Sequence, residues 1–200
     1  MINSPVNTSR SQRRSGARTS AVVLFILISA GGLAACSVLD RGADKAPVAT
    51  TTPAGQAVEA GLAKHVTGDL TGASADYNTA LQNDPKNVLA LYNLGLIAQT
   101  QGDDTGAEAR YQEVLKNDPN YHPALFNLAI IRKAAGDITE AERLYRRAIE
   151  VRPGDAGAHL NLGLLLRETG RKEQGDAEVA TALTLNPKFV DPASVTTREG

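Results

Sequence analysis

The strongest constraint on the fold of this chain is a motif that recurs every 34 residues. The segment 91–119 aligns without gaps with 125–153 and with 159–187, and a less regular copy covers 57–85. One proline closes each copy, at Pro85, Pro119, Pro153 and Pro187. A period of this length, with two helix-like stretches separated by a glycine and ended by a proline, predicts a solenoid of helical hairpins.

Small and aromatic residues occupy equivalent places in the copies. Glycine recurs at Gly68, Gly102, Gly136 and Gly170, and alanine stands one turn before tyrosine in Ala73/Tyr77, Ala107/Tyr111 and Ala141/Tyr145. Together with Leu94-Gly95 and Leu162-Gly163, this pattern resembles the tetratricopeptide repeat family. The resemblance implies an all-α fold, a right-handed superhelical solenoid of four hairpins at 54–87, 88–121, 122–155 and 156–187.

The two end copies depart from the pattern. The first has Ala57 and Ala60 where later copies have larger residues such as Leu91 and Leu94, so we expect its first helix to be the loosest. The fourth has Gly175 in place of alanine and Val179 in place of tyrosine, which predicts a weaker second helix. His159 and Arg132 stand at otherwise apolar places, where we expect an imperfect core with the polar ends directed outwards.

The N-terminal segment 1–35 is typical of an export signal. It begins with a head whose only charges are Arg10, Arg13, Arg14 and Arg18. An uncharged stretch follows at 21–35 and would form a helix of about 22 Å, shorter than the roughly 30 Å hydrocarbon core of a membrane. The segment therefore predicts a secretory signal peptide. The sequence Leu33-Ala34-Ala35-Cys36 then resembles a bacterial lipoprotein signal, which implies that Cys36 is lipidated and becomes the mature N-terminus.

Two alternatives for this segment stay open: an ordinary export signal followed by a chance cysteine, and an uncleaved anchor. All three interpretations predict an extracytoplasmic repeat domain. Ser37 resembles the residue that directs lipoproteins to an outer membrane, so the expected anchor is either the cell membrane or an outer membrane. Cys36 is the only cysteine, and therefore no intrachain disulfide is possible. We expect 36–53 to be a disordered tether and 188–200 a tail too short to cap the last hairpin.

Charge and motif content exclude several classes of function. Removing the four arginines of the signal from 21 basic residues leaves 17 against 22 acidic ones, a net charge of −5, which argues against a nucleic-acid partner. The three histidines fall at unrelated places in their repeats, and the chain has no phosphate loop or nucleophile motif. We therefore expect no catalysis, no metal or other cofactor and no small-molecule substrate.

The candidate binding residues lie on the first helix of each hairpin, which lines the concave groove in the family. Asn93, Asn127 and Asn161 resemble the asparagine ladder with which some relatives bind an extended peptide backbone. Apolar residues flank them at equivalent places: Tyr92, Phe126, Leu160, Leu96, Ile130 and Leu164. Lys133 and Arg167 at the edge would meet acidic groups of a partner. The alternative is that the apolar side chains pack between neighbouring helices and that the asparagines bond locally.

These features predict a membrane-tethered, extracytoplasmic scaffold that binds a peptide or partner protein in its groove and reaches the membrane through Cys36. A narrower version resembles the small repeat-bearing lipoproteins that assist pilus or secretion assembly. The alternative hypothesis is a non-catalytic accessory subunit of an envelope enzyme, such as a protease or a cell-wall synthase.

Overall fold

The computed structural model describes residues 52–195, and this part of the chain consists of nine helices without a strand. All nine helices belong to one compact unit of the chain. The predicted signal peptide, the lipidation site Cys36 and nearly all of the predicted tether lie outside the described residues. Among residues 52–195, no helix combines the length and the apolar character that a membrane crossing requires.

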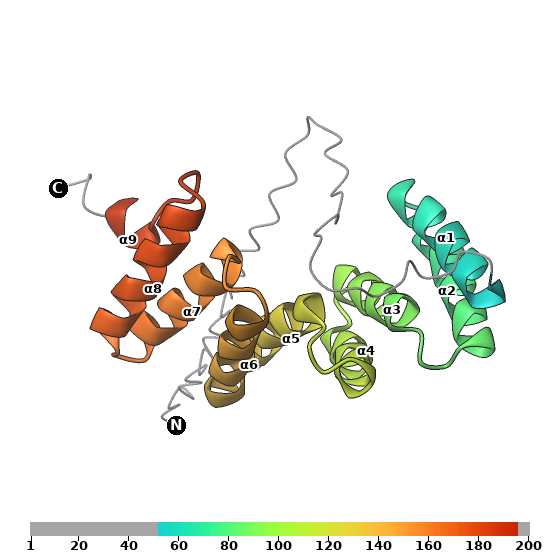
Figure 1. Cartoon of the computed structure of the whole chain (residues 1–200), viewed down its shortest axis with the longest axis horizontal. Helices are drawn as coiled ribbons and strands as arrows, with labels where there is room; N and C mark the ends of the chain where they lie inside the picture. The colour runs from blue at the N-terminus through green and yellow to red at the C-terminus, as the bar shows by residue number, and fades with distance from the viewer. Residues whose placement is uncertain (1–51, 196–200) are drawn as a thin grey trace, which may run out of the picture. The chain divides into compact units, whose positions relative to one another are not determined.

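Eight of the helices form four hairpins that follow one another in chain order (Figure 1). The hairpins pair α1 (Pro53–Val66) with α2 (Leu70–Asn83), α3 (Val88–Thr100) with α4 (Asp104–Asn117), α5 (His122–Ala134) with α6 (Ile138–Val151), and α7 (Ala156–Glu168) with α8 (Lys172–Leu185). The second helix of each hairpin also contacts the first helix of the next one. A short helix, α9 (Pro192–Val195), follows. The predicted all-α array of four hairpins is confirmed.

The turn inside each hairpin depends on one glycine with positive φ. Gly68, Gly102, Gly136 and Gly170 have φ of 83°, 79°, 82° and 82°. Side chains with a Cβ rarely adopt this conformation, so the recurring glycine marks the end of each first helix. In the first three hairpins an aspartate follows and caps the second helix, with Asp69, Asp103 and Asp137 each accepting a backbone N–H bond.

Each second helix ends two residues before the proline of its repeat, at Asn83, Asn117, Val151 and Leu185. Proline has no backbone N–H to donate and restricts the residue before it to extended conformations, so the helix stops there. The proline spacing in the sequence thus determines the length of the hairpins.

The buried core is built around three tyrosines on the second helices. Tyr77, Tyr111 and Tyr145 are at most 1% exposed. Glycines on the first helices make room for these rings: a Cβ on Gly95 would lie 2.6 Å from Cε1 of Tyr111, and one on Gly61 would lie 2.6 Å from Cε1 of Tyr77. Each of these two rings therefore fills the space that the absent side chain of a glycine leaves on the facing helix.

The fourth hairpin packs in a different way from the other three. Val179 replaces the tyrosine and is 1% exposed. Because valine is smaller, the two backbones come together directly: a Cβ on Gly175 would lie 2.6 Å from the carbonyl oxygen of Gly163. The expectation that Gly175 only weakens α8 is wrong, because Gly175 permits this close contact between α7 and α8.

Candidate functional site

The predicted binding residues of α3, α5 and α7 form what we call the first-helix face: Tyr92, Phe126, Leu160, Leu96, Ile130 and Leu164. All six side chains are partly exposed. Tyr92, Leu96, Phe126 and Ile130 also pack against the core. In the first repeat, Leu62 stands at the place of Leu96 and is 40% exposed. Each repeat thus presents one aliphatic side chain that the core covers only in part.

The two aromatic residues of this face bridge neighbouring repeats. The Tyr92 ring centroid lies 5.3 Å from that of Tyr121, the residue directly before α5 of the next hairpin, and 5.8 Å from that of Tyr111. The ring centroid of Phe126 lies 6.0 Å from that of Tyr145. A Cβ on Gly157 of α7 would lie 3.6 Å from Cζ of Phe126. Both rings therefore contact their own hairpin and the start of the next one.

The predicted asparagine ladder is engaged inside the protein. Asn93 Nδ2 donates to the carbonyl of Leu89 at 2.7 Å, and Asn161 Nδ2 donates to the carbonyl of Gly157 at 3.0 Å, both within their own helices. The Nδ2 of Asn127 instead lies 3.2 Å from the hydroxyl of Tyr92 and 3.4 Å from that of Tyr111. Each amide nitrogen therefore has an acceptor already, and the three side chains do not share one geometry.

Asn127 belongs to a polar network that joins the second and third repeats. The Tyr111 hydroxyl accepts from Asn127 and donates to Oε1 of Gln99 at 3.0 Å. Burial raises the pKa of Tyr111 well above its usual value and that of Tyr121 to about 12. The phenols therefore remain protonated at physiological pH, and Tyr111 keeps the proton that its bond to Gln99 needs.

The two cations predicted at the edge of the face are paired within the chain. Lys133 Nζ lies 2.8 Å from Oε1 of Glu168, which links α5 to the end of α7. Arg167 contacts Asp176 on α8 and Asp191 after α8, each at 2.6 Å. Hydrogen bonding from Arg167 holds the pKa of Asp191 below its usual range.

Three further polar residues are also paired. Two of them, His159 and Arg132, stand at places that are apolar in other repeats. His159 Nδ1 lies 2.7 Å from Glu178, and its Nε2 lies 3.0 Å from the carbonyl of Pro153. Arg132 NH2 donates to Glu108 at 2.6 Å. His122 is 7% exposed, and its Nε2 lies 2.8 Å from Oδ2 of Asp155. These polar residues therefore connect helices through specific pairs, whereas the sequence predicted an imperfect core at His159 and Arg132.

Asp155 connects the third and fourth repeats. Its Oδ1 accepts from the backbone N–H groups of Gly157 and Ala158, capping α7, while its Oδ2 faces Nε2 of His122 at the start of α5. Burial alone would raise the pKa of this carboxyl, but the bonds from His122 and the two N–H groups outweigh burial, and the pKa lies below its usual value. One carboxylate therefore holds two repeats together.

The repeats match three family models of one repeat type. A TPR repeat model matches residues 61–102, and tetratricopeptide repeat models match 89–121 and 126–187. The chain is a tetratricopeptide repeat protein. No curated protein matches its sequence significantly.

Several solved structures share the tetratricopeptide fold of this chain. MamA is 19% identical, with a TM-score of 0.62 over 68% of this chain and 79% of that chain. PilF of Pseudomonas aeruginosa is 22% identical, with a TM-score of 0.61 over 68% of this chain, which spans 63% of the PilF chain. A structure of MamA AMB-1 is 21% identical, with a TM-score of 0.58 over 75% of this chain and 82% of that chain. At these identities, the likeness concerns the fold alone.

Tetratricopeptide repeats generally serve as scaffolds for protein partners, and the fold of this chain supports that role. The repeat pattern located the first-helix face, but it did not reveal the carboxylates that engage its cations, Glu168 and Asp191, or the link through Asp155. Asp155 had a signal in the sequence, because it follows Pro153-Gly154 just before a helix, where a capping aspartate is common. The other two had no such signal.

Proposed function

We propose that this protein is a lipid-anchored, extracytoplasmic scaffold that binds a peptide or a partner protein on its first-helix face. The tetratricopeptide fold supports a scaffold, and the signal-like segment before Cys36 supports export and anchoring. The proposal assigns the two ends of the chain separate tasks: Cys36 sets the location, and the repeats select the partner.

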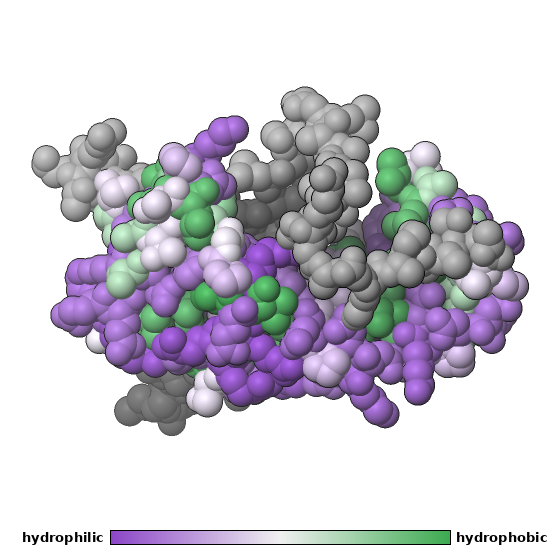
Figure 2. Space-filling view, viewed as in Figure 1, coloured by the Kyte–Doolittle hydropathy of each residue, from purple (hydrophilic) through white to green (hydrophobic). Residues whose placement is uncertain are grey.

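The observation that carries the binding part is the row of aliphatic residues at one place in every repeat. Leu62 is 40% exposed, and Leu96, Ile130 and Leu164 are partly exposed at the equivalent positions. Covering apolar surface contributes about 25 cal/mol of binding free energy per Å². Four such residues at equivalent places therefore offer a partner one favourable contact in each repeat. Figure 2 shows that apolar surface on the side in view lies in separate patches between polar ones.

The hydrogen bonds of the asparagines indicate how the partner is recognised. The amide nitrogens of Asn93, Asn127 and Asn161 already donate inside the protein. A partner backbone would have to break these bonds before it gained an equivalent one, so the net gain would be small. We therefore expect apolar side chains of the partner, rather than its backbone, to supply most of the affinity.

The anchoring part is tested by metabolic labelling with palmitate. The wild-type protein should incorporate the label and remain with membranes after a high-salt wash, because two or more acyl chains give stable anchoring. Cys36→Ser should abolish the label and release the repeat domain or leave an unprocessed precursor. Absence of palmitate on the wild-type protein would contradict lipidation and favour one of the other two signal interpretations.

The binding part is tested by photo-crosslinking in the native host. A photoreactive residue in place of Leu96 should capture a partner, whereas one in place of Glu113, exposed on α4, is the matched control. Adding Ile130→Asp and Leu164→Asp should remove the crosslink, because these changes place charge on the apolar row. Equal crosslinking at Leu96 and Glu113 would argue against the first-helix face.

The identity of the captured product separates the narrower functions. A pilus or secretion component would support a role in assembly, and a stable envelope enzyme would support the accessory-subunit hypothesis. If crosslinks disappear in Cys36→Ser but survive the two aspartate substitutions, then membrane location selects the partner and the first-helix face does not.

A further inference from the structure

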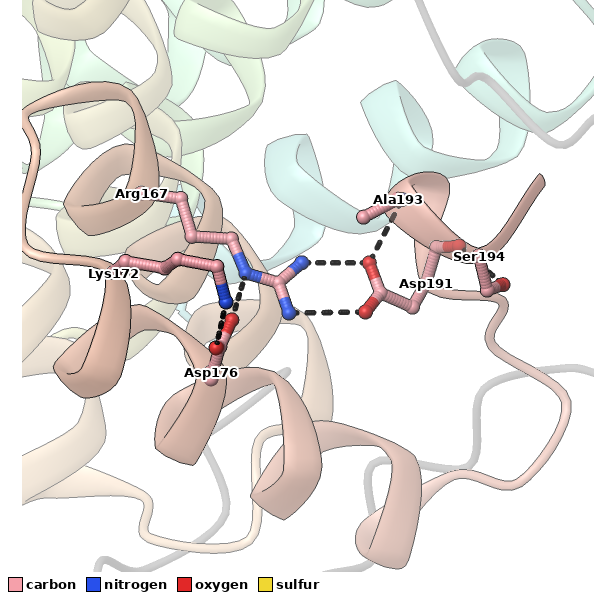
Figure 3. A pocket seen from close by; sticks show the side chains of 6 residues that line it. All are labelled: Arg167, Lys172, Asp176, Asp191, Ala193 and Ser194. Carbon is pink, nitrogen blue, oxygen red and sulfur yellow. Dashed lines mark hydrogen bonds and ion pairs between the residues drawn. The ribbon is translucent and has the colours of Figure 1, made fainter. Parts of the chain in front are cut away.

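The guanidinium of Arg167 is held in place from one side and binds a carboxylate on the other (Figure 3). Its Nε donates to Oδ1 of Asp176 at 2.6 Å, and Lys172 Nζ donates to the other oxygen of Asp176 at 2.5 Å. The two outer nitrogens donate to Asp191, NH1 to Oδ1 at 2.6 Å and NH2 to Oδ2 at 3.0 Å. Asp176 thus fixes the plane of the guanidinium and leaves its outer fork for a carboxylate, the anion whose geometry that fork matches.

The carboxylate in the fork comes from a short and largely exposed segment after α8. Asp191 lies between Val190, which is 62% exposed, and α9, whose residues 192–194 are exposed. Phe189 is partly buried and is the main apolar side chain of this segment. A segment that buries so little apolar area opens locally at low cost, so its position depends strongly on the ion pair with Arg167.

The charges at this place favour an anion once Asp191 leaves. Arg167 and Lys172 balance Asp176 and Asp191, so removal of Asp191 leaves one positive charge in the pocket that these residues line. Arg167 also stands three residues after Leu164 on α7 and therefore lies on the same side of that helix. The pocket continues the aliphatic row of the first-helix face.

We propose that Arg167, positioned by Asp176 and Lys172, is a binding site for an Asp or Glu side chain of the protein partner, with Asp191 as its exchangeable internal ligand. This inference rests on the proposed function, since apolar side chains of the partner at Leu164 bring the acidic group to the pocket. A short linker gives Asp191 an effective concentration in the millimolar range. An acidic group by itself displaces it only at concentrations of this order, whereas a partner that also contacts the aliphatic row displaces it at lower concentrations.

The test uses the full chain, purified in detergent and labelled with ¹⁹F-phenylalanine. The measured quantity is the ¹⁹F resonance of Phe189 in the C-terminal tail. The chain has three phenylalanines, and Phe189→Leu identifies the resonance of Phe189. The probe is a blocked peptide of residues 188–195, KFVDPASV, and the control peptide carries asparagine in place of aspartate. Both are titrated into the wild-type chain, Asp191→Asn, Arg167→Gln and Arg167→Lys.

We expect Asp191→Asn to shift the Phe189 resonance, and the acidic peptide to move the wild-type resonance towards that position. The asparagine peptide should need an about fivefold higher concentration, Arg167→Gln should respond equally to both peptides, and Arg167→Lys should discriminate less than wild type. An unchanged Phe189 resonance in Asp191→Asn, or equal response of the wild-type chain to both peptides, would overturn the proposal. Crosslinking at Leu96 does not depend on Asp191 exchange, so failure here leaves the proposed function standing.

Discussion

The carbonyl oxygen of Gly163 in α7 faces Gly175 of α8 so closely that a Cβ on Gly175 would lie only 2.6 Å from it. The same Cβ would lie 2.7 Å from Cγ and 2.9 Å from the backbone nitrogen of Arg167. Side-chain carbons do not approach other atoms this closely. Two obstructing atoms belong to the backbone of α7, so the helices would have to separate to admit a side chain.

Gly175→Ala should therefore destabilise the protein, although alanine is the better helix former and occupies this place in the other repeats. Helix propensity alone favours alanine by about 1 kcal/mol, whereas overpacking costs about 1–3 kcal/mol. Because the obstructing atoms are backbone, we expect the packing cost to prevail and the free energy of unfolding to fall. Urea denaturation followed by circular dichroism measures the difference.

Gly154→Ala is the matched control for this substitution, because a Cβ there meets no atom within 4 Å. We expect this change to be close to neutral. If Gly175→Ala were as stable as wild type or more stable, α7 and α8 would not be in backbone contact, and the sequence interpretation of Gly175 would be right.

Asn127→Ala should cost more stability than Asn161→Ala. The first removes an amide that bonds hydroxyls on α3 and α4 and so links two repeats, while the second removes a bond within one helix turn. We expect a loss of about 1 kcal/mol for Asn127→Ala and a smaller one for Asn161→Ala, measured by urea denaturation. Equal losses would show that the tyrosine contacts contribute nothing beyond the local bond.

Asp155→Ala should destabilise the link between the third and fourth repeats by about 1–2 kcal/mol at neutral pH, since it removes a helix cap and the partner of His122. The folded pKa of Asp155 lies below its usual value. Its contribution is therefore complete above the unfolded pKa of about 3.9 and is lost as the pH falls through the folded pKa. The difference between wild type and variant should shrink below about pH 4 in urea denaturation.

Asp69→Ala tests whether this effect belongs to the link or to any helix cap. Asp69 also caps a helix, through an exposed bond to Gly72 at 2.8 Å, but it has no histidine partner. Its removal should cost less than that of Asp155 at neutral pH. A wild-type advantage over Asp155→Ala that stays constant down to pH 2 would contradict the assigned role of the carboxylate.

The repeat architecture was predictable because its determinants lie in the local sequence. Gly102 ends a helix because of its own φ of 79°, and Pro119 ends the next one because it lacks an N–H. These properties do not depend on neighbours far along the chain. The register of 34 residues then places Tyr111 opposite Gly95, so the core contact also follows from the sequence.

The interactions of individual side chains were less predictable, because they depend on groups distant in the sequence. Lys133 and Arg167 pair with carboxylates that lie 35 and 24 residues away in the sequence and follow no repeat pattern. Gly175 was misjudged for a related reason. A residue type reveals helix propensity, whereas its packing depends on the distance to a facing backbone, which in turn depends on Val179.

His159 and Glu178 provide the sharpest test of how the fourth repeat is held. Their equivalents in the third repeat are Leu125 and Leu144, which are 0% and 1% exposed. His159→Leu should leave the Glu178 carboxylate and the Pro153 carbonyl without their imidazole partner, and Glu178→Leu should leave His159 Nδ1 without its carboxylate partner. Each single change should cost about 1–3 kcal/mol in the free energy of unfolding.

The double variant His159→Leu, Glu178→Leu should recover most of this loss, because it restores the apolar pair of the third repeat and leaves only the Pro153 carbonyl to be hydrated. Replacing both partners of a hydrogen bond by apolar residues can be nearly neutral, whereas removing one partner leaves the other without its bond. A double-mutant cycle by urea denaturation should therefore give a coupling energy of about 1–3 kcal/mol. Losses that simply add would mean that the 2.7 Å contact does not couple α7 to α8.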